Sequence, residues 1–152
     1  MREIIFKAKR IDNGEWVEGS LLNLDSDSGY CYIVSTYEMA STLPIKSLIL
    51  DRMKLVDPET ICQFTGLTDK NGKKIWENDN CDRKEKYPEI VNMSNEDWTL
   101  DYSYVFDKEL GSSYCNLGFY VNKRNCVEVR GNIFDNPELL KEKSDEQISI
   151  GD

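Results

Sequence analysis

Apolar and polar residues alternate with a period of two over several short segments of the chain. Near the start, Ile4, Phe6 and Ala8 alternate with Ile5, Lys7 and Lys9. This period is typical of a β-strand with one buried face. On this pattern, and on richness in aromatic and β-branched residues, strands are expected at residues 4–9, 15–22, 30–37, 61–67, 73–76, 89–93, 98–106, 114–121 and 126–134, with shorter extended pieces at 47–50 and 53–56.

Two asparagine–glycine pairs mark points at which the chain folds back. Asn13-Gly14 follows the first strand, and Asn71-Gly72 lies between the strands at 61–67 and 73–76. Both residue types tolerate a positive φ, and the pair is the strongest short hairpin signal. Because strand follows strand with no room for a helix, the sequence predicts antiparallel sheets and a mainly β fold.

The predicted architecture is a set of strongly bent antiparallel sheets in two lobes, with an SH3-like small barrel in the second. The joint is placed at Asp57-Pro58, because a residue before proline is pushed out of the helical region. The N-terminal β lobe then spans 1–56 and the barrel-like lobe 57–143, and the two are also compatible with one compact domain. Residues 78–86 are expected to begin as an edge strand and end in a loop.

The end of the chain predicts a short helix followed by a flexible acidic tail over residues 144–152. Asn136 is expected to cap this helix, Pro137 suits its first turn, and Glu138 suits the positive end of its dipole.

The amino-acid composition disfavours or excludes several classes of function. The net charge of −9 favours solubility or an acidic face that meets a basic partner. It disfavours an ordinary DNA-binding protein, which needs cations against phosphates. With no histidine in the chain, Ser-His and Cys-His nucleophile pairs and His-ligated metal sites are excluded.

Five cysteines without C-x-x-C spacing are interpreted as buried residues of a protein in a reducing cytoplasm. The apolar run near Met1 is too short for a signal peptide, and no segment approaches the roughly 20 apolar residues that span a bilayer. Glycine-rich nucleotide loops and the G-x-S-x-G motif are absent. We therefore expect a cytoplasmic, non-enzymatic protein with no cofactor, no metal site and no membrane association.

Three segments resemble the YopX protein family of bacteriophages and prophages. They are residues 2–10, the central stretch 56–79, and residues 131–140. In the second, Asn78 stands where the family commonly has glycine, and asparagine is the next best residue for a positive φ. The motif positions, interpreted as structural, are Thr65, Gly66, Asp69, Asn71, Gly72, Asp79, Gly131, Asn132, Asn136 and Pro137.

The resemblance implies a β-rich fold with a small barrel-like lobe, in a phage-encoded or prophage-encoded protein of the bacterial host cytoplasm. It implies no activity, because the family has no assigned reaction and no known catalytic residues.

Small basic groups beside aromatic residues form a candidate interaction surface. They could bind a phosphate backbone with stacked bases, or they could be an ordinary surface of charge pairs. The candidate residues are Lys9, Arg10, Trp76, Arg83, Lys84, Lys86 and Tyr87.

Four acidic residues cluster around the second hairpin, at positions 69, 77, 79 and 82. They could ligate a divalent cation, but turn formers and a solvated edge are the favoured interpretation. Trp16, Trp76 and Trp98 are expected in the core rather than at an interface.

The leading hypothesis is a phage or prophage accessory protein that acts as a protein-interaction module for a host or phage protein, with a homo-oligomer as a further option. The alternative is a small β-barrel associated with nucleic acid, and an enzyme that uses carboxylates or a cation is third. An apolar patch rimmed by acid would favour a protein partner. A continuous basic groove would favour nucleic acid, and a deep pocket with facing carboxylates an enzyme.

Overall fold

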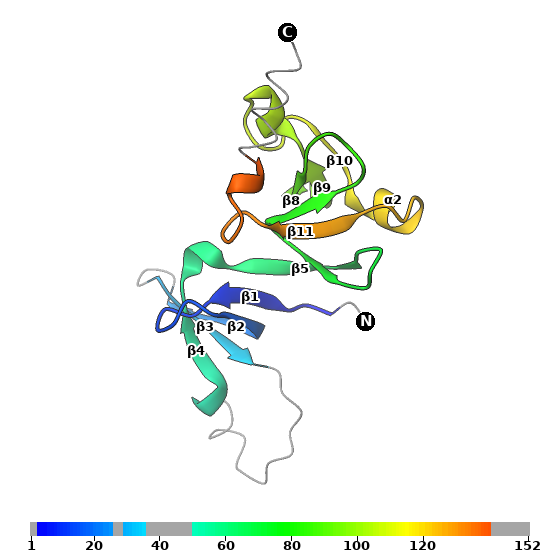
Figure 1. Ribbon diagram of the computed structural model, residues 1–152. Coiled ribbons are helices and arrows are strands. Elements are labelled where there is room, and N and C mark those ends of the chain that lie inside the picture. Colours follow the sequence, from blue (N-terminus) through cyan, green and yellow to red (C-terminus); the bar gives the residue numbers. More distant parts are fainter. Residues whose placement is uncertain (1–2, 26–28, 36–49, 141–152) are drawn as a thin grey trace. The chain divides into compact units, whose positions relative to one another are not determined.

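The computed structural model describes residues 3–25, 29–35 and 50–140. The chain divides into two compact units, unit 1 (Met1–Phe64) and unit 2 (Thr65–Asp152). The division falls within one strand, β5 (Cys62–Thr68), which therefore contributes to both units. Each unit is built around strands, so the predicted mainly β fold is confirmed (Figure 1).

Unit 1 is an antiparallel sheet in which the neighbouring strands follow the order β4-β3-β2-β1-β5. Its strands are β1 (Phe6–Lys9), β2 (Trp16–Asp25), β3 (Tyr30–Ser35), β4 (Met53–Val56) and the first part of β5. The β1–β2 connection is the predicted hairpin, with Gly14 at φ 72° and its N–H donating to the carbonyl of Arg10.

The sheet of unit 1 is strongly bent, as predicted. Gly19 lies so close to β3 that a Cβ there would be 2.0 Å from the Val34 carbonyl oxygen, so only glycine fits. At the other end, a bridge pairs Arg10 with Val56 of β4. Among the described residues, this single bridge joins β4 to the chain that follows β1. The strand pairings therefore bend the sheet, but they do not close it into a barrel.

A short 3-10 turn, η1 (Pro58–Thr60), connects β4 to β5. The Asp57 side chain accepts a hydrogen bond from Glu59 N at 3.0 Å. Thr60 is buried and its hydroxyl accepts from Lys9 N at 2.8 Å, which ties the turn to β1. The core beneath is made of Ala8, Cys31, Ile33 and Val56, with Phe6, Val17, Leu21 and Ile61 packed around it.

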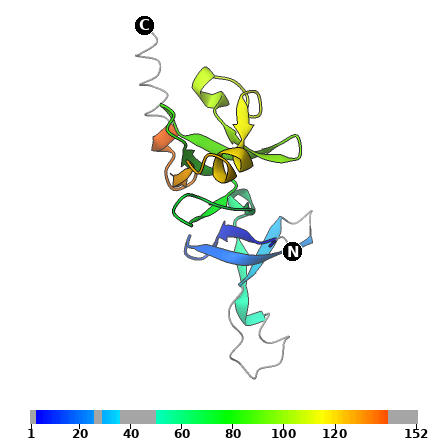
Figure 2. The same cartoon turned by 90° about the vertical axis from the view of Figure 1, so that its right-hand side faces the viewer.

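Unit 2 contains the second part of β5, which neighbours β6 (Lys74–Trp76), and a five-stranded sheet of order β10-β9-β8-β7-β11. Figure 2 shows this sheet from a second direction. Its strands are β7 (Asp79–Asp82), β8 (Glu89–Ser94), β9 (Asp97–Asp101), β10 (Tyr114–Asn116) and β11 (Glu128–Asn132). Over residues 65–140 no pairing joins β10 to β11, so the sheet is open where a barrel was expected.

The expectation of an edge strand at the start of 78–86 is wrong. β7 lies between β8 and β11, and Asp79, Asn80 and Cys81 are all buried. The polar side chains of this segment indicate exposure to solvent when the sequence is considered alone. At least two of them bond inside the protein instead, as Asp79 Oδ2 accepts from Trp76 N and Asn80 Nδ2 donates to the Asn136 carbonyl.

Two predicted strands are shorter than expected because helical turns replace their second halves. The strand at 98–106 ends at Asp101 and is followed by a 3-10 helix, η2 (Ser103–Phe106). The strand at 114–121 ends at Asn116, where α2 (Leu117–Asn122) begins. The Asn116 side chain accepts from Phe119 N at 2.7 Å, and this cap outweighs the β propensity of the aromatic residues that follow.

The end of the described chain is partly as predicted. Residues 138–140 are helical, whereas the acidic tail and the outer parts of the 30–37 and 47–50 predictions lie outside the described residues. Leu50, the one residue of 47–50 that is described, is helical rather than extended.

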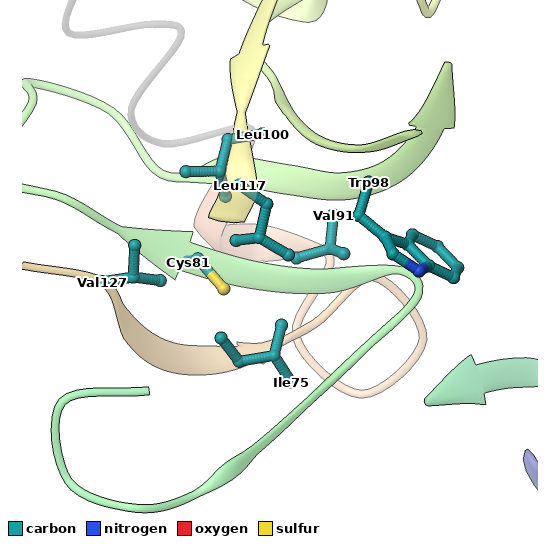
Figure 3. Close-up of a cluster of buried hydrophobic side chains, with 7 residues drawn as sticks. All are labelled: Ile75, Cys81, Val91, Trp98, Leu100, Leu117 and Val127. Atoms are coloured by element: carbon teal, nitrogen blue, oxygen red, sulfur yellow. The ribbon is translucent and has the colours of Figure 1, made fainter. Parts of the chain in front are cut away.

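The core of unit 2 collects apolar side chains from strands and helix together (Figure 3). Its members are Ile75, Cys81, Val91, Trp98, Leu100, Leu117 and Val127. Trp76 is also buried, so the core assignment of Trp76 and Trp98 is confirmed. Among the helices of the described residues, none is long and apolar enough to cross a membrane.

Candidate functional site

The Asp69 carboxylate is a structural tether rather than a free functional group. It is 6% exposed, and its Oδ1 accepts from the backbone N–H of Asn71 and Lys73, both at 2.9 Å. Its Oδ2 accepts from Val129 N of β11, also at 2.9 Å. Burial alone would raise the pKa of Asp69, but these backbone N–H groups lower it below its usual value. These contacts fit the turn-forming interpretation of Asp69. The solvated-edge interpretation does not fit Asp69 and Asp79, which are buried, whereas Glu77 and Asp82 are half-buried.

The other predicted motif residues also serve the chain's own geometry. Thr65 is buried and its hydroxyl donates to the Ile75 carbonyl at 2.7 Å. Gly66 and Gly72 have φ of 84° and 83°, which glycine adopts without strain. Asn78 has φ 70°, and its backbone N–H donates to Val91 while its carbonyl accepts from Ile133.

The closing motif is a compact turn built around two asparagines. Asn132 Oδ1 accepts from the N–H groups of Phe134 and Asp135, at 2.9 and 2.8 Å. Asn136 Oδ1 accepts from Asn132 N at 3.3 Å, so its side chain turns back toward β11. A Cβ at Gly131 would lie 2.3 Å from that Asn136 oxygen. Pro137 is exposed just before the helical residues 138–140.

The residues of the candidate interaction surface do not share one environment. Lys9 and Arg10 belong to unit 1, where Lys9 Nζ lies 5.4 Å from the Trp16 ring centre and Arg10 pairs with Asp12 at 2.6 Å. The other candidates belong to unit 2. Of these, Trp76 is 6% exposed and cannot offer its ring to a ligand.

The Arg83 guanidinium is turned toward the interior of unit 2. It lies 4.5 Å from the Tyr120 ring centre, and its Nη1 donates to Glu85 at 2.9 Å. Its Nε is 2.6 Å from Glu89 Oε1, although that N–H is not aligned for a hydrogen bond. Lys84 and Lys86 remain exposed on the segment between β7 and β8, and Tyr87 is half-buried.

Sequence reasoning missed Glu89, a fully buried acid at the edge of the core. Burial raises the pKa of Glu89 to about 7, although Arg83 and the Cys115 thiol act to lower it. The thiol donates to Glu89 Oε2 at 3.6 Å, and burial followed by the Glu89 charge raises the pKa of Cys115 to about 12. The alternation of side chains along β8 indicates that Glu89 is buried, because Glu89 lies on the same face of the strand as the core residue Val91. In the sheet, Glu89 pairs directly with Cys81, another core residue.

A second missed acid, Asp101, anchors the segment that we call the 102–113 loop. Asp101 has no exposed surface. Its Oδ1 accepts from Ser103 N at 2.9 Å, and its Oδ2 accepts from Gly111 N at 2.6 Å. Backbone bonds from Tyr102 to Ser113 and from Lys108 to Ser103 close the base of the loop. Hydrogen bonds to a buried carboxyl group therefore fix both ends of the loop.

The 102–113 loop presents apolar side chains to solvent. Phe106 is 52% and Leu110 62% exposed. Asp107 and Glu109 lie between them and are exposed, with Lys108 Nζ 5.8 Å from the Phe106 ring centre. Within the loop, the Tyr102 ring contacts Phe106 at 6.3 Å between centres, and it also contacts Tyr87 at 6.1 Å. The loop thus carries two exposed apolar side chains with two acidic residues and one lysine between them in sequence.

An open hollow of about 290 Å³ is lined by Ser94, Asn95, Asp97, Thr99, Tyr114, Cys115 and Asn116. Its polar groups largely engage one another, since Asn95 Nδ2 donates to the Tyr114 hydroxyl and Asn116 Nδ2 to Asp97 Oδ2. In the parts of the chain that the structure describes, no group of three or more cysteine and acidic residues is placed to hold a metal ion.

A comparison with known protein families shows to which family the chain belongs. The family model described as YopX protein matches residues 5–141. The chain belongs to the YopX protein family. No curated protein matches it. A solved structure that resembles it is protein EF1440 from Enterococcus faecalis, with a TM-score of 0.47 and 21% sequence identity over 92% of this chain and 99% of that one.

In this YopX-family chain, the motif residues mainly serve as buried tethers and turns, and Gly131 packs closely against Asn136. The most exposed large apolar side chains of unit 2, among the described residues, lie elsewhere, on the 102–113 loop.

Proposed function

We propose that this YopX-family protein is a non-enzymatic accessory protein of a phage or prophage that binds a host or phage protein in the bacterial cytoplasm. The observation that carries the proposal is the pair Phe106 and Leu110, the most exposed large apolar side chains of unit 2 among the described residues. Isolated exposed apolar residues are common. Two of them on a loop held by a buried carboxylate are a recognition feature, because binding loops are commonly carried on a rigid scaffold.

The anchoring of the loop favours binding because it reduces the entropy lost on association. A loop closed by the Asp101 carboxylate and by the Ser103–Ser113 hydrogen bonds has few conformations to lose. A pre-organised surface retains more of its contact energy as affinity.

The charges around the patch indicate the kind of partner. Asp107 and Glu109 lie between the two apolar residues with Lys108 as the one base among them, and the whole chain carries −9. Charge complementarity speeds encounter and suppresses wrong partners. The partner we propose therefore has an apolar pocket bordered by basic residues.

The nucleic-acid alternative is less well supported by the geometry. It relied on basic residues beside Trp76 and Tyr87, but Trp76 is buried and Arg83 lies against Glu89. The exposed cations that remain, Lys84 and Lys86, are accompanied by Glu85.

A photo-crosslinking residue placed at Phe106 tests the proposal in the bacterial host. We expect it to capture one protein that the same residue at Ile11, exposed in unit 1, does not. With that protein purified, Phe106→Ala and Leu110→Ala should each weaken binding about thirtyfold, as for an interface anchor worth about 2 kcal/mol. Ile11→Ala should leave the affinity unchanged.

Three results would contradict the proposal. The first is equal capture at positions 106 and 11, and the second is crosslinks solely between copies of this chain. The third is binding of single-stranded DNA that weakens steeply with salt and survives Phe106→Ala, which would establish the nucleic-acid alternative.

A further inference from the structure

Glu89 sits at a junction of four parts of unit 2 with no exposed surface of its own. It starts β8, and its carboxylate meets Arg83 from the segment before that strand, which we call the 83–88 segment. The Cys115 thiol of β10 donates to the other carboxylate oxygen. Arg83 is held in turn against the Tyr120 ring of α2.

The charged neighbours of Glu89 do not fully compensate its burial. Arg83 Nε and Glu89 Oε1 are 2.6 Å apart but are not aligned for a hydrogen bond. Arg83 also pairs with Glu85, a second negative charge near the site. The other titratable groups around Glu89 are neutral in their ordinary states: Cys81, Tyr87, Tyr102, Tyr104, Cys115 and Tyr120. Arg83 is therefore the cation that opposes the charge of Glu89 in this cluster.

The 83–88 segment is suited to local opening. Lys84 adopts φ 74°, a left-handed conformation that a residue with a long side chain rarely takes. Lys84, Glu85 and Lys86 are all exposed. Within the segment, Tyr87 is half-buried and Pro88 is buried, with the Pro88 carbonyl accepting from the Tyr104 hydroxyl. Opening therefore concerns residues 83–86, where exposed side chains and an unfavourable φ are features of regions that open at low free energy.

We propose that Glu89 is a proton-dependent latch that keeps residues 83–86 closed over the core when neutral and favours their release when ionised. When these residues are released, Arg83 leaves Tyr120 and Glu89 becomes hydrated. The closed state therefore binds the Glu89 proton more tightly than the open state does. Proton binding favours the state that holds the proton more tightly, so opening increases as the pH rises.

The size of the effect follows from the two proton affinities. The pKa of Glu89 is about 7 in the closed state against an ordinary value of 4.5 for a hydrated glutamate. Between these limits the ratio of open to closed molecules should rise about tenfold for each pH unit, and it should level off above pH 7. The full change is about 300-fold, from the difference of about 2.5 pH units.

Two nuclear magnetic resonance measurements on the full chain test the latch without a binding partner. The side-chain carboxyl carbon of Glu89 should titrate with a midpoint near 7. Amide hydrogen exchange over 83–86, corrected for its intrinsic pH dependence, should show protection that falls from pH 4.5 to 7 and then stays constant. In Glu89→Gln the corrected protection should be independent of pH. In Glu85→Gln, which removes the exposed partner of Arg83, the pH dependence should remain.

A second variant keeps the test decisive if Glu89→Gln does not fold. Arg83→Gln removes the cation that opposes the Glu89 charge, so the carboxyl midpoint should move further up. A wild-type midpoint near 4.5 would overturn the proposal. So would protection over 83–86 that does not change with pH, or a pH dependence that is the same in wild type and Glu89→Gln.

Discussion

The 69–73 turn and the 83–89 segment of unit 2 each hold a buried acid, and they treat it in opposite ways. Asp69 receives backbone N–H groups from Asn71, Lys73 and Val129, and its pKa falls below the usual value. Glu89 receives a misaligned guanidinium and a weak thiol donor, and its pKa rises to about 7. Burial opposes the charged form at both places and does so more strongly at Glu89, so the outcome follows from the depth of burial together with the number and alignment of donors.

This contrast separates two uses of a buried carboxyl group. A carboxylate surrounded by backbone N–H donors fixes the chain in one shape, because each donor would otherwise be left without a partner. A carboxyl group with poorly aligned donors can change its charge within a physiological range of pH. Asp101 belongs to the first kind by its hydrogen bonds, and it extends the comparison to the 102–113 loop.

The largest effect is expected for Asp101→Ala, which removes the anchor of that loop. The N–H groups of Ser103 and Gly111 would lose a charged acceptor inside a fully buried site. Each buried donor left unpaired costs roughly 1–3 kcal/mol, so the free energy of unfolding should fall by about 3 kcal/mol in urea denaturation. Asp107→Ala, on the exposed surface of the same loop, should change it by less than about 0.5 kcal/mol. Equal effects of the two variants would refute the anchoring role.

Asp69→Asn tests the same principle at the 69–73 turn. The amide oxygen replaces only one of the two acceptors, so either the turn or the bond to Val129 N is lost. We expect a loss of about 2 kcal/mol at neutral pH. Because the pKa of Asp69 is lowered from 3.8 on folding, its contribution is present above 3.8 and is lost as the pH falls through the native pKa. The difference between wild type and variant should therefore shrink in acid, and a difference that stays constant down to pH 2 would contradict this assignment.

Glu89→Gln should show the opposite pH dependence. Between 4.5 and about 7 the native carboxyl group holds a proton that the unfolded chain has released, so wild-type stability contains a term that falls as the pH rises. Over that range the term should amount to about 3 kcal/mol, since each pH unit between the two pKa values contributes about 1.4 kcal/mol. Denaturation of wild type and Glu89→Gln at pH 5 and pH 7.5 measures it. A variant whose stability changes with pH as much as that of wild type would show that Glu89 does not titrate in this range.

The alternation of side chains and the Asn-Gly turns were sufficient to predict the hairpins and the mainly β fold. They were sufficient because both are local properties of the chain. The central position of β7 could not be predicted, since its polar residues are satisfied by partners distant in sequence, such as Asn136 for Asn80. Asp101 was equally hidden, because Gly111 reaches it only after the loop has formed.

For the candidate site, the sequence indicated a turn former at Asp69 and an acidic surface but not the 102–113 loop. Phe106 and Leu110 differ little from core residues in a sequence, and only the ending of β9 at Asp101 places them outside. The basic residues were a weaker guide, because Arg83 faces Glu89 rather than solvent.

The smallest effect is expected at Asn116, whose side-chain acceptor is a neutral amide oxygen. It tests whether a neutral acceptor of backbone N–H groups fixes the chain in the way that the buried carboxylates do. Asn116 Oδ1 accepts from Phe119 N and begins α2, the helix that replaced a predicted strand, while its Nδ2 donates to Asp97 Oδ2. Asn116→Ala should cost about 1 kcal/mol, the usual value for a lost helix cap. Asn116→Asp would keep a good cap but would turn a carboxylate toward Asp97, so its stability should recover only below the pH at which one of the two acids is protonated. If Asn116→Asp were as stable as wild type at pH 7, the contact with Asp97 would contribute nothing, and α2 would depend on its cap and its packing alone.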